Sequence, residues 1–240
     1  MPELPEVETT VRGLVSVLEG RRLVAVEARR EDLRRAFPPV LRQRPTGATV
    51  TSLGRRAKYG LVDTDRGDTL VFHLGMSGRW RIDPPEIGIH DHFVLETDRH
   101  RRLTLNDPRR FGSLDLVRTD ALPLYGPFVR MGPEPLSEAF DAAYLGEVLS
   151  GRAAPIKALL LDQRVVAGLG NIYACEALYR AGIHPARAAG SISLARLERR
   201  LSPGHRLCRL CQLGQEPGRH RPREAMGDVD RADRARELGP

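Results

Sequence analysis

Two residues near the start of the chain, Pro2 and Glu3, could perform chemistry together. Cleavage of Met1 before a small residue such as Pro2 would expose a secondary amine, whose pKa of roughly 8 leaves a useful fraction neutral near neutral pH. The adjacent Glu3 could then donate a proton. The same residues also suit an ordinary helix start, because proline is common at the first helical position and acidic side chains favour a helix N-terminus.

Further motifs follow this opening in a fixed order. They are Arg55–Tyr59 (RRAKY), His73–Gly78 (HLGMSG), Asn106–Gly112 (NDPRRFG), Leu160–Gln163 (LLDQ) and Gly168–Ala174 (GLGNIYA). Together with the opening MPELPEVE, these motifs resemble those of the formamidopyrimidine-DNA glycosylases, which are bacterial base-excision repair enzymes. Leu4 favours this branch over endonuclease VIII, in which the fourth residue is typically glycine. The resemblance extends from Met1 to about Leu201.

The resemblance implies a DNA glycosylase and abasic-site lyase that excises oxidised purines such as formamidopyrimidine and 8-oxoguanine. Pro2 would attack the anomeric carbon and form an iminium, after which β-elimination would nick the abasic strand. Glu3 would transfer a proton to the sugar ring oxygen, and Lys58 matches the second proton donor of the family. Considered alone, Lys58 is also compatible with a solvated lysine at a strand end.

A base inside a duplex must be flipped out before it can be excised, which costs a few kcal/mol of stacking and pairing. The resemblance assigns the filling of the resulting hole to Met76, Arg109 and Phe111. A thioether and an aromatic ring are suitable wedges, and a guanidinium can hold the unpaired cytosine. Arg109 and His90 also match positions that contact DNA phosphates. Without the resemblance, Met76 would be assigned to the core and the segment 107–110 to a turn.

The second half of the chain resembles the helix-two-turn-helix module of the same family. The glycines of the Gly168–Asn171 turn precede a helix, where free backbone amides and the helix dipole could bind a phosphate. Asn171 matches the phosphate-binding asparagine of the family, and Lys157 is a second candidate DNA contact. A glycine turn followed by a helix is otherwise an ordinary cap, and a lysine on a helix surface is usually solvated.

Composition agrees with a DNA-binding enzyme. The 240 residues carry a net charge of +7, with arginine as the main cation, which favours a polyanionic partner and here predicts damaged double-stranded DNA. A basic protein with solvated surface arginines would have the same composition. The chain has no apolar run that could span a membrane and no signal-peptide pattern, so we expect a cytoplasmic protein, with monomer as the family default.

The periodicity predicts an α+β fold in which a catalytic N-terminal helix precedes a β-sandwich and a helical module follows. Apolar residues at helical spacing from Leu4 to Leu18 predict the first helix, with Gly20 as its C-cap. Strands are expected at 23–28, 49–53, 60–64, 69–74, 93–96, 102–105 and 114–117, and turn signals at 65–68 and 98–100 predict two antiparallel hairpins among them. Helices are expected near 140–148, 156–160, 172–178 and 194–201. The expected domains are 1–125 and 126–201. Cys175 is expected to be a buried thiol in the third of these helices.

Residues 202–240 depart from the family pattern, which continues there with a four-cysteine zinc finger. The segment contains one Cys-x-x-Cys, formed by Cys208 and Cys211, with His205 and His220 as conceivable further ligands. Half a site does not normally hold structural zinc, so no zinc is assigned. The composition predicts a disordered tail and resembles an out-of-frame translation. This leaves open an impaired enzyme, a catalytically weak protein that binds damaged or abasic DNA, or a product that does not fold stably.

Overall fold

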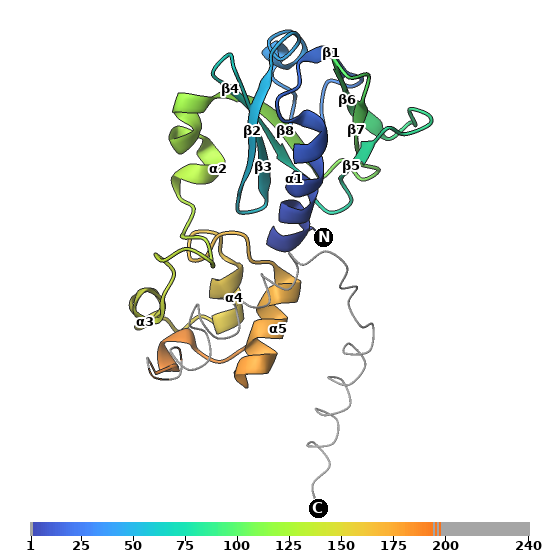
Figure 1. The fold of residues 1–240 in the computed structure, drawn as a ribbon. Helices are drawn as coiled ribbons and strands as arrows, with labels where there is room; N and C mark the ends of the chain where they lie inside the picture. The colour runs from blue at the N-terminus through green and yellow to red at the C-terminus, as the bar shows by residue number, and fades with distance from the viewer. Residues whose placement is uncertain (1, 194, 196, 198–240) are drawn as a thin grey trace, which may run out of the picture.

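The computed structural model of the chain describes residues 2–193, 195 and 197. The upper lobe in Figure 1 contains a pair of four-stranded antiparallel sheets. In spatial order, the first sheet contains β1 (Leu23–Ala28), β6 (Asp91–Thr97), β7 (Arg102–Asn106) and β5 (Arg79–Ile82). The second sheet contains β2 (Val50–Arg56), β3 (Tyr59–Thr64), β4 (Asp68–His73) and β8 (Ser113–Arg118).

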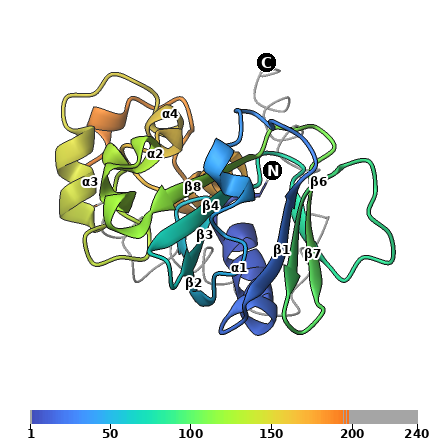
Figure 2. The ribbon, with the colours of Figure 1, turned by 90° about the horizontal axis from the view of Figure 1, so that it is seen from above.

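Helix α1 (Leu4–Leu18) lies at the opening between the two sheets when the molecule is seen from above (Figure 2). Its apolar residues recur every three or four positions and therefore share one face. Val7, Val11 and Leu14 belong to the core of the sandwich, whereas Leu4 belongs to the core of the helical lobe. Complete burial of one such side chain contributes about 1.5–3 kcal/mol, so α1 anchors the start of the chain in both lobes.

The lower lobe in Figure 1 is helical. It contains α3 (Ala142–Leu149), α4 (Ile156–Leu161), α5 (Asn171–Ala181) and the 3-10 turn η3 (Ala189–Ser191). The Asp141 side chain caps α3 by accepting the Tyr144 backbone N–H at 2.7 Å. Gly182, with a φ of 58°, ends α5 in the left-handed conformation that glycine adopts without strain. Ordinary capping interactions therefore define the start of α3 and the end of α5.

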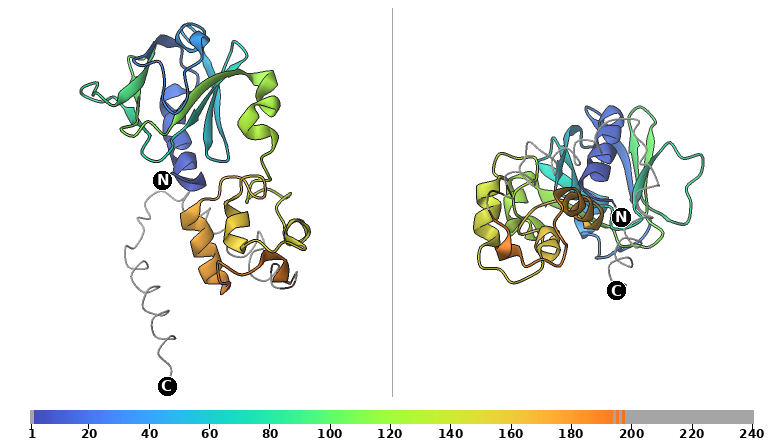
Figure 3. Two further views of the ribbon diagram at one scale, coloured as in Figure 1. Left: turned by 180° about the vertical axis from the view of Figure 1, so that it is seen from behind. Right: turned by 90° about the horizontal axis from the view of Figure 1, so that it is seen from below.

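Short helical segments connect the main elements. The 3-10 turn η1 (Pro39–Arg42) follows β1, and η2 (Thr119–Leu124) and the single-turn helix α2 (Gly126–Val129) follow β8. Seen from behind in Figure 3, α2 lies beside the sandwich and the chain then descends into the helical lobe. The predicted limits of the two domains, 1–125 and 126–201, remain a prediction.

The predicted fold class is confirmed, and so are both predicted hairpins. Strands β3 and β4 pair across the turn at 65–67, and β6 and β7 pair across the turn at 98–101. Each of the seven predicted strands is present, with ends shifted by at most three residues. The prediction missed β5, a four-residue strand at the edge of its sheet that pairs only with β7. Its pattern, Arg-Trp-Arg-Ile, is too short to give a periodicity signal.

Two details of the helices differ from the prediction. Helix α1 has Glu19 at its C-cap, and Gly20 follows with a φ of 71°, so the predicted cap is one residue too late. Cys175 is exposed and not buried, because it lies on the face of α5 opposite the buried residues Ala174, Ala177 and Leu178. The helices predicted near 140–148, 156–160 and 172–178 correspond to α3, α4 and α5.

Several predictions fall outside the described residues. These are the completion of the helix at 194–201, the disordered tail at 202–240 and the weak zinc candidates Cys208 and Cys211. Among the helices that the structure describes, none combines the length and apolar character required to cross a bilayer.

Candidate active site

The start of α1 is held by side chains and by the other lobe. Glu3 is the N-cap of α1, and its backbone N–H donates to Glu6 Oε2 at 2.9 Å in a capping box. The backbone N–H of Leu4 donates to the Gly168 carbonyl oxygen at 3.3 Å. Pro2, immediately before this capped turn, is half-buried. The position of Pro2 is therefore set jointly by the helix and by the segment that precedes α5.

The Glu3 side chain is completely buried against the start of α5. Its two carboxylate oxygens accept the backbone N–H groups of Ile172 at 2.9 Å and Tyr173 at 3.2 Å. A Cβ atom at Gly170 would lie 2.4 Å from the Glu3 carboxyl carbon, so only glycine permits this approach. The amides of Ile172 and Tyr173 are therefore occupied by Glu3, in a location that the helix dipole favours for a carboxylate. Phosphate binding by the preceding glycine turn at 168–171 remains a prediction.

Lys58 lies in the tight turn between β2 and β3 and is half-buried. Burial lowers the pKa of Lys58 below its usual value, while the negative charges of Glu3 and Glu6 act in the opposite direction. These charges act on Lys58 because the turn faces the start of α1. The structure thus brings Lys58 within range of the charge of Glu3, and Pro2 directly precedes Glu3 in the chain.

A carboxylate from beyond the sandwich holds the Lys58 turn. Glu134 Oε1 accepts the Ala57 backbone N–H at 2.5 Å, and Ala57 has a φ of 52°, a left-handed conformation that is strained for alanine. Glu134 also pairs with Arg55 at 2.7 Å and with Arg56 at 3.0 Å. The sequence motif Arg55–Tyr59 therefore contains two arginines that lock the turn to the segment after α2, which the sequence analysis did not recognise.

His73, at the end of β4, is a site neighbour that the sequence analysis did not single out. Its Nδ1 accepts the Gly75 backbone N–H at 3.0 Å, which leaves the proton of the neutral ring on Nε2. Burial lowers the pKa of His73 to about 4, and nearby cations add to this shift. The cations are Lys58, Arg34 and Arg35. Its position opposite Tyr59 in the β3–β4 ladder could have been found once the hairpin register was known.

Two loops present the residues predicted to fill the hole in the duplex. Met76 and Phe111 are each 43% exposed, so the assignment of Met76 to the core is wrong. The Arg109 guanidinium carbon lies 4.7 Å from the centroid of the Phe111 ring, a cation–π distance. Gly75 has a φ of 60°, and a Cβ atom there would lie 2.4 Å from the Phe111 carbonyl carbon, so the two loops are in close backbone contact.

His90 is exposed and lies just before β6, in a segment anchored by the buried carboxylate of Asp91. Asp91 accepts hydrogen bonds from three side chains and one backbone amide. The donors are Arg81 Nη1 at 2.7 Å, Gly88 N at 2.7 Å, Asn106 Nδ2 at 2.9 Å and Thr104 Oγ1 at 3.0 Å. The middle residue of the triplet His90-Asp91-His92 is therefore structural, and the exposed His90 lies next to the Asp107 loop, where its carbonyl oxygen accepts the Asp107 backbone N–H.

Asn171 and Lys157 lie in the helical lobe. Asn171 is exposed at the first position of α5, next to the glycines that contact the start of α1. Lys157 is half-buried in the first turn of α4. Their assignment as DNA contacts remains a prediction. Asn171 lies at the start of α5, where Glu3 accepts the neighbouring backbone N–H of Ile172.

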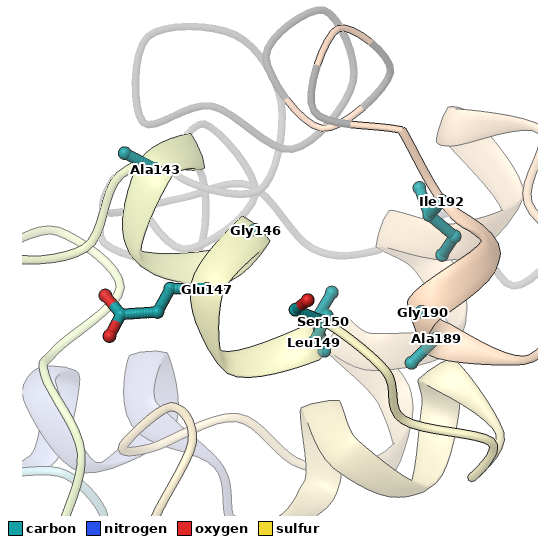
Figure 4. A pocket seen from close by; sticks show the side chains of 8 residues that line it. All are labelled: Ala143, Gly146, Glu147, Leu149, Ser150, Ala189, Gly190 and Ile192. Atoms are coloured by element: carbon teal, nitrogen blue, oxygen red, sulfur yellow. The ribbon is translucent and has the colours of Figure 1, made fainter.

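The described residues contain no cluster of three or more histidine, cysteine, aspartate or glutamate side chains that could bind a metal ion. A surface pocket between α3 and η3 contains none of the predicted site residues (Figure 4). Its lining includes a single ionisable side chain, Glu147. The predicted catalytic residues lie instead where the two lobes meet, at the start of α1.

Comparisons with known proteins agree with this geometry. The model of the formamidopyrimidine-DNA glycosylase N-terminal domain matches residues 1–114, and the model of the H2TH domain of the same enzymes matches residues 131–203. A formamidopyrimidine-DNA glycosylase of Rhizorhabdus wittichii is 69% identical over 199 residues, which is 83% of this chain and 74% of the relative. One from Novosphingobium aromaticivorans is 63% identical over 193 residues, covering 80% and 72% of the two chains.

Solved structures lead to the same family. The crystal structure of the MutM (Fpg) protein from Thermus thermophilus superposes with a TM-score of 0.76 at 41% identity, covering 89% of this chain and 77% of the other. The formamidopyrimidine-DNA glycosylase of Lactococcus lactis, bound non-covalently to DNA containing an abasic site, gives a TM-score of 0.81 at 32% identity and covers 89% and 82% of the two chains.

Proposed function

Because this chain belongs to the formamidopyrimidine-DNA glycosylase family, we propose that it excises oxidised purines from duplex DNA and then nicks the abasic strand. The proposed substrates are formamidopyrimidine and 8-oxoguanine lesions. The proposed nucleophile is the secondary amine of Pro2 after removal of Met1. Two crystal structures of one relative support DNA as the partner, because the Lactococcus lactis enzyme was crystallised with DNA that contains an abasic site and with DNA that contains N7-benzyl-Fapy-dG.

The observation that carries this proposal is the surroundings of Pro2. Glu3 follows it in the chain, completely buried with its carboxylate on the start of α5, and Lys58 is close enough for the charges of Glu3 and Glu6 to act on it. A helix start whose acids served only for capping would not require a partly desolvated lysine beside it. A nucleophile, a carboxyl group and an amine with a lowered pKa are the groups that an iminium mechanism uses.

The proposed reaction proceeds in balanced steps. The neutral Pro2 nitrogen attacks C1′, and the electron pair of the glycosidic bond leaves with the base, which takes up a proton. The Pro2 nitrogen then passes its proton to the Glu3 carboxylate. Glu3 donates this proton to the ring oxygen as the C1′–O4′ bond breaks, and the nitrogen lone pair forms the iminium. Removal of a C2′ proton expels the 3′ phosphate with the C3′–O electron pair, which nicks the strand by β-elimination.

The remaining candidate residues have roles in access to the base. Met76, Arg109 and Phe111 would enter the duplex when the damaged nucleotide leaves it, since an unstacked step needs apolar replacement. His90, Lys157 and Asn171 would contact the DNA backbone, which supplies most of the affinity of a basic protein for a duplex. Met76 and Phe111 are each 43% exposed, which leaves both side chains accessible to a duplex.

Borohydride trapping tests the proposal directly, because reduction converts an iminium into a stable covalent adduct. The assay uses the full chain with two duplexes, one with an abasic site and one with 8-oxoguanine opposite cytosine. The Pro2→Gly variant is the control, and an intact-mass measurement establishes that Met1 has been removed. We expect adducts on both duplexes with the wild-type protein and none with Pro2→Gly.

Other results would assign a different function. Trapping on the abasic duplex alone would restrict the protein to lyase activity. Binding of both duplexes without any adduct, by folded protein that lacks Met1, would refute the catalytic proposal. The protein would then be a damaged-DNA or abasic-site binding protein.

A further inference from the structure

Asp107 is a fully buried carboxylate that bonds two separate loops. It follows the last residue of β7, where the chain leaves the first sheet. Its Oδ1 accepts the Ser77 hydroxyl at 2.7 Å, and its Oδ2 accepts the Gly112 backbone N–H at 2.8 Å. The two oxygens therefore connect the loop after β4 with the loop before β8.

The backbone of the same residue contacts a third segment. The Asp107 N–H donates to the His90 carbonyl oxygen at 3.0 Å, and the Asp107 carbonyl oxygen lies 3.0 Å from His92 Nε2. A single buried residue thus has polar contacts within its own loop, through Gly112, and with two segments more distant in sequence, through Ser77 and through His90 and His92. A buried network of this kind rigidifies its surroundings only when each polar group is satisfied, and here both carboxylate oxygens have donors.

The contacts of Asp107 lie next to the residues proposed to enter the duplex. Ser77 follows Met76, and Gly112 follows Phe111, so each hydrogen bond fixes the loop one residue away from a wedge side chain. Arg109 lies between Asp107 and Phe111 and stacks on the Phe111 ring. All of these wedge side chains are exposed, so they have little other packing to hold them in place.

We infer that Asp107 is a positioning residue for base extrusion: it holds Met76, Arg109 and Phe111 in the arrangement that replaces the flipped nucleotide. This role rests on the proposed function. Preorganised wedges do not have to be ordered during insertion, whereas freed loops lose conformational entropy at that step. Loss of the Asp107 contacts should therefore slow reactions that need base extrusion and spare reactions that do not.

The test compares two substrates with each variant. One is a duplex with 8-oxoguanine opposite cytosine, and the other is a single-stranded oligonucleotide with a preformed abasic site, which has no stacked base to extrude. For each protein, the single-turnover rate of excision from the duplex is divided by the single-turnover rate of borohydride trapping on the single strand. This quotient is the duplex-to-single-strand ratio. Asp107→Asn turns one acceptor into a donor that faces another donor, and Ser77→Ala removes only the first loop contact.

We expect the duplex-to-single-strand ratio to fall about tenfold in Asp107→Asn, the scale of one lost buried hydrogen bond. Ser77→Ala should lower the ratio less, and the double variant should fall short of the product of the two effects, because both changes remove the same contact. Asp68→Asn is the matched control. Asp68 is a buried aspartate paired with Arg44 at 2.9 Å at the opposite end of β4, and its substitution should leave the ratio unchanged.

An unchanged duplex-to-single-strand ratio in Asp107→Asn, with or without an equal loss of both rates, would overturn the positioning role. If that variant unfolds at the assay temperature, Ser77→Ala decides the question, since an unchanged ratio there overturns the role as well. A wild-type protein without activity on either substrate would refute the proposed function itself. The positioning role alone would be refuted if the wild-type protein is active and the variants have the same duplex-to-single-strand ratio.

Discussion

A carboxylate oxygen of Glu3 lies 2.9 Å from the backbone nitrogen of Ile172, although 169 positions separate the two residues. The contact fixes the start of α1 to the start of α5 and thereby joins the sandwich to the helical lobe. Leu4 reinforces it by packing in the core of the helical lobe. The geometry around Pro2 therefore depends on the relative position of two parts of the chain, and substitutions in either part should affect catalysis.

Gly170→Ala should impair catalysis without contacting DNA. The new Cβ atom would lie 2.4 Å from the Glu3 carboxyl carbon, and the carboxylate would have to move off the amides of α5. We expect the single-turnover excision rate to fall at least tenfold, since misplacement by about 1 Å can have a hundredfold effect. Gly13→Ala is the control because its Cβ has no neighbour within 4 Å, and it should keep activity and gain about 0.5–1 kcal/mol of stability. Unaltered activity in Gly170→Ala would contradict the role of this approach.

Lys58→Met should raise stability while it lowers activity. The pKa of Lys58 is below the usual 10.5, chiefly because of burial, so the folded protein carries an unfavourable charge near neutral pH. The methionine removes this charge, and loss of a proton donor should lower excision roughly a hundredfold or more. As pH rises through the folded-state pKa towards 10.5, the wild-type lysine becomes neutral and the stability advantage of the variant should shrink. Denaturant unfolding at several pH values measures it, and a constant advantage would argue against a buried charge.

His73→Asn should flatten the acid side of the stability profile. The folded-state pKa of about 4 is below the ordinary 6.5, so the folded protein binds fewer protons than the unfolded chain between these values. This contribution to stability is complete above pH 6.5 and is lost as pH falls towards 4, with a size of at most about 3 kcal/mol. Asparagine retains an acceptor near the position of Nδ1 for the Gly75 amide. Urea denaturation at about pH 7 and about pH 4.5 should show a smaller difference for the variant than for the wild type.

Glu134→Gln should destabilise the turn that carries Lys58. Arg55 is 12% exposed and Glu134 is 19% exposed. Removal of the negative charge leaves Arg55 with Glu8, at 3.0 Å, as its carboxylate partner and leaves Arg56 with the carbonyl oxygens of Met131 and Gly132. We expect a loss of about 2 kcal/mol in the free energy of unfolding, between the values for exposed and for buried pairs, and a lower excision rate. Glu138→Gln, an exposed change in the same segment, should stay within about 0.5 kcal/mol of the wild type. Equal thermal melts for the two variants would exclude the proposed clamp.

Local elements were largely predictable because local signals encode them. The spacing of Leu4, Val7, Val11 and Leu14 predicted α1, and the turn residues at 65–68 predicted the β3–β4 hairpin. Strand β5 was missed because four residues at a sheet edge carry too little periodicity, and its pairing with β7 is a long-range contact. The exposure of Cys175 was missed because helical content alone does not indicate which face packs inward.

By itself, the sequence determined the family, through ordered motifs, and it determined the candidate residues Pro2, Glu3 and Lys58. Tertiary structure alone decided how the site residues are held: Glu3 on the amides of α5, the Lys58 turn on Glu134, and the Met76 loop on Asp107 through Ser77. It also showed that the Glu3 carboxylate occupies two backbone amides at the start of α5. The physical reason is that each of these contacts joins residues far apart in the chain, whose distance depends on how whole elements pack and not on the spacing of side chains within any one of them.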